Sequence, residues 1–184
     1  QAQIHPHFIF NTLNSIIALS ELDQEKMRKL LNEFSTYLRS KYQYYDIDEL
    51  IPLKEELRVV RSYLNIEQVR FGDRLQVIWQ VDHEDDIEVP FLSIQPLVEN
   101  AVHHGIMRKA EGGSVTISIK EYDNNVKITI KDNGLGMDPK QLSEVMDREN
   151  DSRTGVGLLN THQRIKRLFG TGLTVTSEKE KGTV

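Results

Sequence analysis

The sequence contains no cysteine, no long hydrophobic run and no excess of positive charge. The absence of cysteine excludes disulfides, thiolate catalysis and cysteine-ligated metals, and it is compatible with a reducing cytoplasm. No apolar stretch approaches the roughly 18 residues that a membrane-spanning helix needs, and the start Gln1-Ala2-Gln3 is not that of a signal peptide. Because the net charge is −5, no overall field favours nucleic acid or an anionic membrane surface. We therefore expect a soluble fragment that does not bind nucleic acid.

The chain has 184 residues, 38% of them hydrophobic, which is enough for a helical module followed by a compact second domain. From Pro6 to about residue 71 the apolar residues follow a helical period, and the clearest stripe consists of Met27, Leu30, Leu31, Phe34, Tyr37 and Leu38. After Gly72 the period becomes that of a strand, in which apolar residues alternate with polar ones at Leu75, Val77, Trp79 and Val81. These patterns predict a helical region over residues 1–71 and a second domain over residues 72–184. We expect both ends to be cuts in a longer protein.

The second domain combines strands and helices. A hairpin is predicted from the alternating residues 115–119 and 126–130, joined by a turn at residues 123–125. Helices are predicted over residues 91–107, from Asp138 onward and over residues 158–169, and a last strand over residues 173–177. Asp138 can cap its helix, with Pro139 in the first position and Gln141 completing a capping box. Helices gathered against a mixed or antiparallel sheet give an α+β sandwich.

A histidine stands at the start of the first predicted helix, between Pro6 and Phe8, with Asn11 one turn later. A neutral imidazole has a free nitrogen lone pair near pH 7, so it can attack phosphorus and form a phosphoramidate. Taken alone, a histidine at a helix start is more often an ordinary surface residue. His7 is therefore a candidate nucleophile whose role depends on the sequence around it.

The predicted helix over residues 91–107 carries Glu99, Asn100, His103 and His104. Asn100 and His104 are four residues apart and share a face of this helix. An asparagine carbonyl is a hard oxygen ligand, which suits a Mg²⁺ ion that keeps several waters and bridges phosphates. By itself, an asparagine on a helix more often has a structural or solvent-facing role.

Two glycine-containing strings carry further candidates. Asp132 begins residues 132–136, and its carboxylate, which only accepts hydrogen bonds, can recognise the exocyclic amino group of adenine while repelling the carbonyl of guanine. As a bare tripeptide, however, Asp-Asn-Gly is usually a turn. Residues 153–160 open a helix, so their backbone amides can point at phosphate oxygens. The polar residues 147–157 are predicted to form a lid that is mobile without nucleotide and closes with it.

Residues 3–14 closely resemble the phosphoacceptor box of the LytS/YehU-type histidine kinases. In that family the histidine between proline and phenylalanine is phosphorylated, so the resemblance selects His7 over His5. Residues 53–71 also look like the linker that joins the acceptor helices of this family to its ATP-binding domain.

The later strings resemble, in the family order, the boxes of the GHKL ATP-binding fold that histidine kinases share with gyrase, Hsp90 and MutL. Residues 97–105 resemble its N-box, which implies that Asn100 coordinates magnesium. The resemblance also implies that Glu99 serves as a general base or positions the attacking group. It places His103 and His104 among the cofactor-binding residues, with His103 at a position where many relatives have lysine.

The Asp-x-Gly-x-Gly pattern resembles the G1 box, in which Asp132 would read adenine while Gly134 and Gly136 allow the base to come close. The glycine-rich stretch, together with Asn160 and Arg164, resembles the G2 box. The resemblance implies that the loop of Gly155 and Gly157 holds the phosphates, and it places Val156, Leu158 and Asn160 among the cofactor-binding residues. Gly182-Thr183 resembles the final box, whose hydroxyl on Thr183 would help to hold the adenine.

The resemblance implies a helical dimerisation and acceptor module followed by a Bergerat-type (GHKL) α/β sandwich that binds ATP and Mg²⁺. It implies the sensor histidine kinase of a two-component system, autophosphorylated on His7, with a response regulator of the LytTR type as its partner. We expect the apolar stripes of the first two helices to pair with their copies in a homodimer. The chain would then be the cytoplasmic part of a bacterial inner-membrane protein, in contact with the membrane only through upstream segments.

Two alternatives stay open. A nucleotide-binding scaffold could dimerise through the helices and signal without phosphotransfer, and it differs from a kinase in whether ATP labels His7. A GHKL ATPase of the gyrase or MutL kind would hydrolyse ATP to drive a clamp motion, and this hypothesis leaves the acceptor string unexplained.

Overall fold

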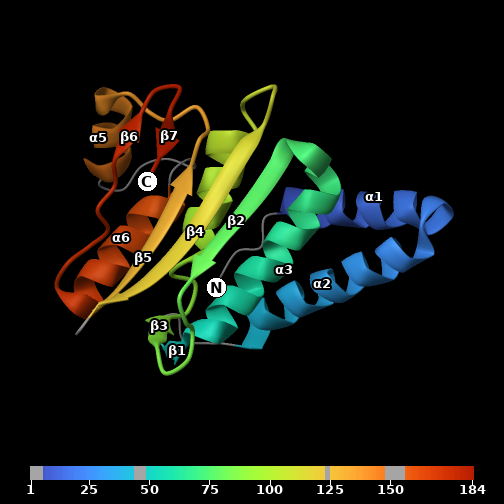
Figure 1. The fold of residues 1–184 in the computed structure, drawn as a ribbon, viewed down its shortest axis with the longest axis horizontal. Helices are drawn as coiled ribbons and strands as arrows, with labels where there is room; N and C mark the ends of the chain where they lie inside the picture. Colours follow the sequence, from blue (N-terminus) through green and yellow to red (C-terminus); the bar gives the residue numbers. More distant parts are fainter. Residues whose placement is uncertain (1–5, 44–48, 123–124, 148–155) are drawn as a thin grey trace.

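The computed structural model of the chain describes residues 6–43, 49–122, 125–147 and 156–184. Its N-terminal part is helical, as Figure 1 shows, with α1 (Pro6–Leu22), α2 (Gln24–Gln43), the short strand β1 (Leu50–Pro52), α3 (Leu53–Phe71) and the turn η1 (Gly72–Arg74). The middle of the chain forms β2 (Leu75–Val81), β3 (Glu88–Pro90), α4 (Gln95–Asn100) and the π-helical η2 (Ala101–Ile106). The last part contains β4 (Gly113–Tyr122), β5 (Asn125–Asp132), α5 (Pro139–Asp147), α6 (Val156–Phe169), β6 (Ser177–Glu178) and β7 (Gly182–Thr183).

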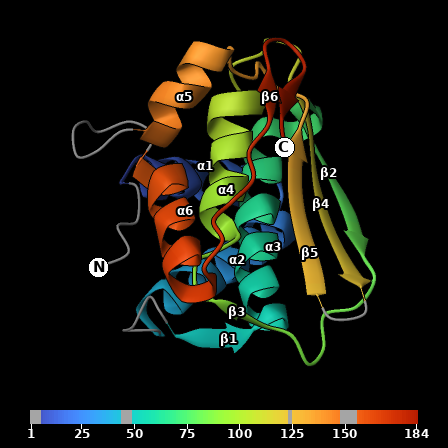
Figure 2. The same cartoon turned by 90° about the vertical axis from the view of Figure 1, so that its left-hand side faces the viewer.

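The main sheet has the strand order β2-β4-β5. β2 runs parallel to β4, whereas β4 and β5 are antiparallel and pair Ile117 with Ile130. This pairing confirms the predicted hairpin, of whose turn residues Asp123 and Asn124 lie outside the described part of the chain. Figure 2 shows that the helices cover one face of this sheet. The α+β sandwich predicted from the sequence is confirmed.

The apolar stripe of α2 finds its partner within the same chain. Leu30, Phe34 and Tyr37 are buried, and the ring of Tyr37 lies 4.8 Å from that of Phe8 on α1 and 6.3 Å from that of Tyr63 on α3. These aromatic rings belong to a hydrophobic core that continues from α1 to the inner face of the sheet. The buried residues of the stripe therefore hold the three helices together, while Leu31 of the same stripe stays 47% exposed.

Local signals at two helix starts are confirmed. The backbone amide of Lys26 donates to Asp23 Oδ1 at 2.9 Å, which caps α2. At α5, the amide of Gln141 donates to Asp138 Oδ1 and the amide of Asp138 donates to Gln141 Oε1, at 2.8 and 3.1 Å. These reciprocal bonds form the predicted capping box.

Two predicted elements differ from the structure. The helix expected over residues 91–107 begins only at Gln95, because Leu92 has a positive φ of 56° that breaks the helical path. The prediction of a strand over residues 173–177 was wrong except at its last residue, because the strand β6 covers only Ser177–Glu178. Thr176 and Val184 still exchange two backbone hydrogen bonds, of 2.9 and 2.8 Å. Residues 173–175 have no paired strand in the described part of the chain, and alternation alone does not make a ladder.

Candidate functional site

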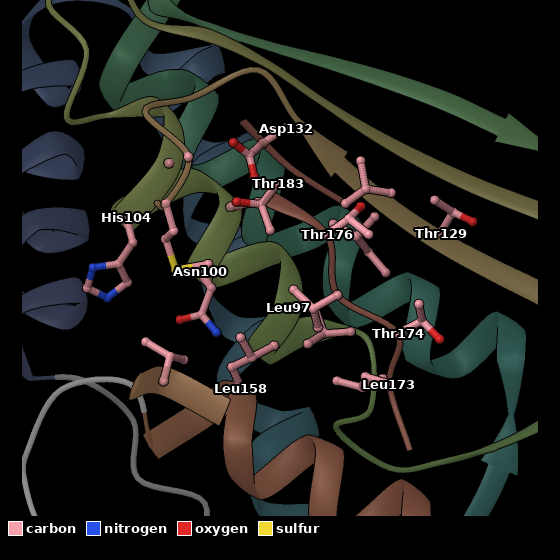
Figure 3. Close-up of a pocket in the computed structure, with 18 of the residues that line it drawn as sticks. Leu97, Asn100, His104, Thr129, Asp132, Leu158, Leu173, Thr174, Thr176 and Thr183 are labelled. Atoms are coloured by element: carbon pink, nitrogen blue, oxygen red, sulfur yellow. The ribbon is translucent and has the colours of Figure 1, made fainter. Parts of the chain in front are cut away.

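A cavity of about 1010 Å³ lies between α4 and η2, the strand β5, the start of α6 and residues 172–176. Figure 3 shows side chains from these elements turned toward this common space. Six of the residues selected from the sequence line it, namely Asn100, His104, Asp132, Gly136, Leu158 and Thr183. Residues that are distant in the sequence therefore converge on one cavity large enough for a nucleotide.

Asp132 ends β5 and is 4% exposed. Its Oδ1 accepts the backbone amide of Gly134 at 2.8 Å. Burial raises the pKa of this carboxyl above its usual range, and the amides of Gly134 and Thr183 offset part of that rise because they stabilise the ionised form. A Cβ on Gly105 would lie 2.6 Å from Asp132 Oδ1, so only glycine fits beside the carboxylate at that point of η2. The result is a buried hydrogen-bond acceptor facing the cavity.

Next to Asp132, hydrogen bonds of two hydroxyl groups connect the β6–β7 hairpin to the loop that follows β5. Thr183 Oγ1 lies 2.8 Å from Ser177 Oγ, which accepts the amide of Met137 at 2.8 Å and donates to the carbonyl of Gly182 at 3.1 Å. Gly136 has a φ of 60°, and a Cβ there would overlap the carbonyl of Glu178. The glycine expected to let a base come close therefore also allows the β6–β7 hairpin to pack over this loop.

The opposite wall is built by α4 and η2. Asn100 and His104 both line the cavity, as their four-residue spacing predicts. Between them the helix widens into a π-helical turn, with the amide of Met107 bonded to the carbonyl of Val102 at 2.8 Å. A Cβ on Gly157 would lie 3.7 Å from Asn100 Nδ2, which places the start of α6 next to this asparagine.

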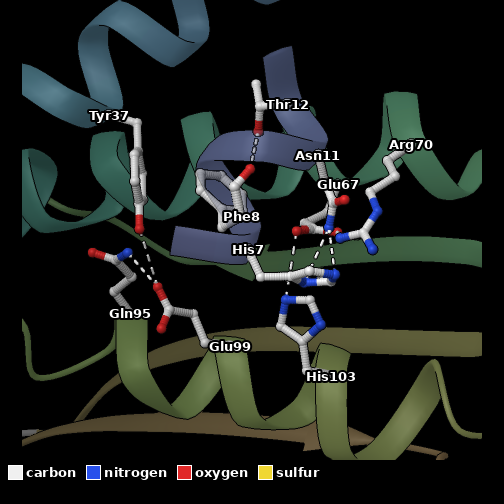
Figure 4. Close-up of polar contacts among 10 residues, drawn as sticks. All are labelled: His7, Phe8, Asn11, Thr12, Tyr37, Glu67, Arg70, Gln95, Glu99 and His103. Atoms are coloured by element: carbon white, nitrogen blue, oxygen red, sulfur yellow. Dashed lines mark hydrogen bonds and ion pairs between the residues drawn. The ribbon is translucent and has the colours of Figure 1, made fainter. Parts of the chain in front are cut away.

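Glu99 and His103 do not line the cavity. Glu99 Oε1 accepts a hydrogen bond from Gln95 Nε2 at 2.6 Å and one from the Tyr37 hydroxyl at 3.4 Å. His103 Nε2 lies 3.5 Å from Glu67 Oε1 on α3. Figure 4 shows these contacts on the side of the helix that faces α1, α2 and α3. Burial raises the pKa of Tyr37, and the negative charge of Glu99 raises it further. The same helix thus presents one face to the cavity and the other to the N-terminal helices.

His7 is exposed in the first turn of α1. The Asn11 amide nitrogen lies 3.1 Å from His7 Nδ1 and 3.2 Å from Nε2. The next residue, Phe8, is buried with its ring 5.5 Å from that of Tyr63. This burial fixes the start of α1 against α3 while the imidazole beside it stays accessible. His7 does not line the cavity.

The remaining candidate residues either lie away from the cavity, fall outside the described residues, or stand at a helix end. Gly134 is buried against the backbone of Gly105, and Asn160 is exposed on α6 without lining the cavity. Gly155 lies outside the described residues, as do residues 148–154 of the predicted lid. Val156 begins α6, and the lid residue Asp147 ends α5. The lid therefore stays a prediction.

The sequence reasoning missed two residues of this site. Ser177 connects Thr183 to the loop after β5, and no local signal distinguishes it from an ordinary strand serine. Arg108 lines the cavity, with Nη2 3.4 Å from His104 Nδ1. Its signal was available, because a basic residue one turn after His104 shares the face that Asn100 begins.

Comparisons with known proteins agree with this geometry. The family described as "Histidine kinase" matches residues 1–75, and the family described as "Histidine kinase-, DNA gyrase B-, and HSP90-like ATPase" matches residues 86–184. The chain is 45% identical over 173 residues to the sensor histidine kinase YpdA of Escherichia coli (strain K12), covering 94% of this chain and 30% of YpdA. It is 40% identical over 188 residues to the sensor protein LytS of Bacillus subtilis (strain 168), covering 100% of this chain and 32% of LytS. The chain thus spans about a third of the length of these two relatives.

Solved structures show the same fold. The catalytic domain of the histidine kinase ThkA superposes with a TM-score of 0.57 at 17% identity, covering 73% of this chain and 91% of that domain. ThkA in complex with the response regulator protein TrrA matches with a TM-score of 0.53 at 17% identity, over 96% of this chain and 57% of that one. At these identities the likeness concerns the fold, with a helical part followed by a mixed sheet covered by helices.

Proposed function

This chain belongs to the LytS-type sensor histidine kinases, and we propose that it uses ATP to phosphorylate His7 and passes the phosphoryl group to an aspartate of a response regulator. In the first step a nitrogen of the His7 imidazole forms a bond to the γ-phosphorus of ATP. The bond between that phosphorus and the bridging oxygen breaks, and ADP leaves with the electron pair. The family membership also means that the sandwich domain is of a nucleotide-binding kind.

The observation that supports ATP best is the convergence of Asp132, Thr183 and Asn100 on one cavity. A buried carboxylate accepts hydrogen bonds and donates none when ionised, so it suits the amino group of adenine. Asn100, His104 and Arg108 line the opposite wall, where amide and cationic groups suit the phosphates. The first turn of α6 (Val156–Phe169) lies near Asn100 and adds the unpaired backbone amides of a helix start.

The donor set also fits magnesium. No group of three His, Asp or Glu side chains that could hold a metal occurs within residues 6–43, 49–122, 125–147 and 156–184. Mg²⁺ needs no such cage, because it is usually bound by one or two protein oxygens together with substrate phosphates and waters. We propose that the carbonyl oxygen of Asn100 is that protein ligand. The metal held there would supply positive charge that offsets the negative charge of the phosphates.

Glu99 is proposed as the general base because of its place beside Asn100 in the N-box pattern. The contacts of its Oε1 with Gln95 and Tyr37 favour a position on the acceptor side of the helix. From there it could act on an attacking group that approaches from the N-terminal helices. His103 lies on the same side, which favours a role toward those helices over a contact with phosphate.

We propose a homodimer through α1 and α2. The outer side of α1 exposes Phe10, Leu13 and Ile17, of which Phe10 and Ile17 are each 66% exposed. Their spacing of three and four residues forms one apolar stripe, and Leu31 on α2 is 47% exposed. Exposed apolar stripes on two antiparallel helices can be buried by a second copy as a four-helix bundle.

The partner downstream is proposed from the relatives. ThkA has been solved with a response regulator, and the LytS relationship favours a regulator of the LytTR type for this chain. No helix within the described residues is long and apolar enough to cross a membrane. YpdA and LytS are about three times as long as this chain. We therefore also propose that further segments of the protein attach it to an inner membrane.

Labelling with γ-labelled ATP tests the kinase proposal. The wild-type chain should acquire a label that is lost in acid, as expected of a phosphoramidate, and His7→Gln should abolish it. His7→Gln should leave ATP affinity nearly unchanged, because His7 does not line the cavity. His5→Gln is the matched control and should label normally. An acid-stable label, or full labelling of the His7 variant, would contradict the proposal.

A further inference from the structure

A cluster of buried polar groups lies between α1, α3 and η2, on the side of η2 away from the nucleotide cavity. Glu67 on α3 is 0% exposed, and neither of its carboxylate oxygens has a hydrogen-bond partner among the described residues. Its contacts are two ion pairs of 3.5 Å, from Oε2 to Arg70 Nη1 and from Oε1 to His103 Nε2. The hydroxyl of Tyr63 and Nη1 of Arg70 are also buried without a hydrogen bond in that part of the chain.

An arrangement of this kind is costly unless something completes it. A buried carboxylate gains its stability from hydrogen bonds, and ion pairs of 3.5 Å are too long to supply them. Nearly all buried polar groups in folded proteins are satisfied, so several unsatisfied atoms in one place indicate a missing partner. Since Glu67 can only accept when ionised, the group that would complete it is a hydrogen-bond donor.

The place of the cluster points to one donor. The ring of Tyr63 lies 5.5 Å from that of Phe8 and 6.4 Å from that of His103, so the start of α1 and η2 meet over the same tyrosine. Figure 4 shows the His7 side chain directed into the space around Glu67 and His103. His7 itself is exposed, and its two ring nitrogens lie 3.1 and 3.2 Å from the amide nitrogen of Asn11 on the same helix. The imidazole of His7 is therefore a possible hydrogen-bond donor placed beside the unsatisfied carboxylate of Glu67.

We propose that Glu67 is a positioning residue for the phosphoacceptor, and that it accepts a hydrogen bond from Nδ1–H of His7. This inference rests on the proposed function and adds a residue to it. With the proton held at Nδ1, the outer nitrogen Nε2 keeps its lone pair and faces outward. When Nε2 forms its bond to the γ-phosphorus and ADP leaves, positive charge develops on the ring. The Glu67 carboxylate balances that charge and can take the Nδ1 proton.

The other groups around Glu67 support this assignment. Arg70 and His103 hold the carboxylate from two sides, and the guanidinium of Arg70 is itself fixed 4.5 Å above the ring of Phe71. The pKa of Tyr63 is raised mainly by burial and next by the negative charge of Glu67, so the tyrosine stays neutral. Glu99 differs from Glu67, because its Oε1 already accepts hydrogen bonds from Gln95 and Tyr37.

The test combines labelling with a direct measurement of the His7 ring. In Glu67→Gln the initial rate of His7 labelling should fall at least about 10-fold, because a neutral amide replaces the charge-assisted bond. The KM for ATP should stay within about 2-fold, since Glu67 does not line the cavity. Glu67→Asp should restore part of the rate. The control Glu55→Gln, on the same helix but in a solvent-facing pair with Arg58, should label like the wild type.

Nitrogen NMR of labelled histidine gives the readout that a purely structural role would not change. In the wild-type chain His7 should be mainly the Nδ1–H tautomer, whereas free histidine prefers Nε2–H, and Glu67→Gln should move His7 toward the free ratio. A wild-type His7 with the free ratio would overturn the inference even if no variant folds. Wild-type labelling rates in Glu67→Gln would overturn it as well. A wild-type chain that never labels His7 would instead contradict the proposed kinase function, so the two failures are distinguishable.

Discussion

The carboxylate of Glu56 accepts the backbone amide of Ile94 at 2.9 Å, across 38 residues of sequence. It also accepts the amides of Leu92 and Gln95, at 2.9 and 3.2 Å. The start of α4 has no cap from its own side chains, so Glu56 on α3 satisfies the amides that a helix start leaves unpaired. The helix that carries Asn100 is therefore held at its first turn by a fully buried side chain from another element.

Replacing Glu56 should destabilise the fold strongly. Glu56→Ala leaves buried amides without an acceptor, and we expect a loss of about 2 to 5 kcal/mol in the free energy of unfolding. Glu56→Gln keeps one acceptor oxygen and should lose less. Urea unfolding followed by circular dichroism measures both, with Glu55→Ala on the exposed side of the same turn as a control. Equal stability of Glu56→Ala and Glu55→Ala would show that the amides find other partners.

Features encoded by neighbouring residues were predictable from the sequence. The hairpin of β4 and β5 follows from strict alternation, and the capping box of Asp138 and Gln141 follows from their spacing. Remote contacts were not. The cap that Glu56 provides to α4 depends on where α3 packs, and the start of α4 was therefore predicted four residues too early.

In the candidate site, too, residues that belong to local motifs were predictable, whereas residues placed by remote contacts were not. Asp132, Asn100 and Thr183 carry motif signals, and the structure brings all three to one cavity. Ser177 has no motif, since its role comes from the pairing of β6 with β7. Likewise, the stripe of α2 indicated a helix that needs a partner, but periodicity cannot say whether that partner belongs to the same chain.

Asp132→Asn should weaken ATP binding and stabilise the nucleotide-free protein. An amide can present a donor where adenine also presents one, so we expect a loss of about 10- to 100-fold in affinity, the range of a charge-assisted hydrogen bond. Titration calorimetry with excess magnesium measures this change. Asp138→Asn is a matched control, because it retains an acceptor for the cap of α5 and does not line the cavity. Wild-type affinity in Asp132→Asn would contradict the adenine role.

The stability effect of Asp132→Asn should depend on pH. Because the pKa of Asp132 is raised in the folded state, the folded chain binds the proton more tightly than the unfolded chain. This group therefore favours folding at low pH, and its contribution is lost as pH rises through the raised pKa. Asparagine does not ionise, so the variant does not lose folding free energy as the pH rises. It should therefore have a higher melting temperature than the wild type at pH 7. The difference should shrink as pH approaches about 3.9, the ordinary aspartate pKa.

Charges on the outer side of α1 should dissociate the proposed dimer. Phe10→Glu combined with Ile17→Glu would place two carboxylates in the apolar stripe, where burial of unpaired charge is unfavourable. We expect a rise of at least about 10-fold in the dissociation constant measured by sedimentation, with the fold unchanged because both positions are exposed. Lys29→Glu, an exposed charge change on α2, should leave association unchanged. A wild-type chain that is monomeric at all concentrations would argue against the bundle.

Arg108→Gln should weaken the binding of nucleotide phosphates without changing the preference for adenine. Arg108 lines the cavity beside His104, whereas Asp132 and Thr183 form a separate wall, so only charge attraction to the phosphates should be lost. Because the side chain is exposed, solvent screens this attraction, and we expect about a 5- to 10-fold loss for ATP. The loss should be smaller for adenosine than for ATP, and it should decrease as salt is added. Arg58→Gln, which removes an exposed cation that does not line the cavity, serves as the control. An equal loss of affinity for adenosine and ATP would mean that Arg108 supports the wall itself and does not act on the phosphates.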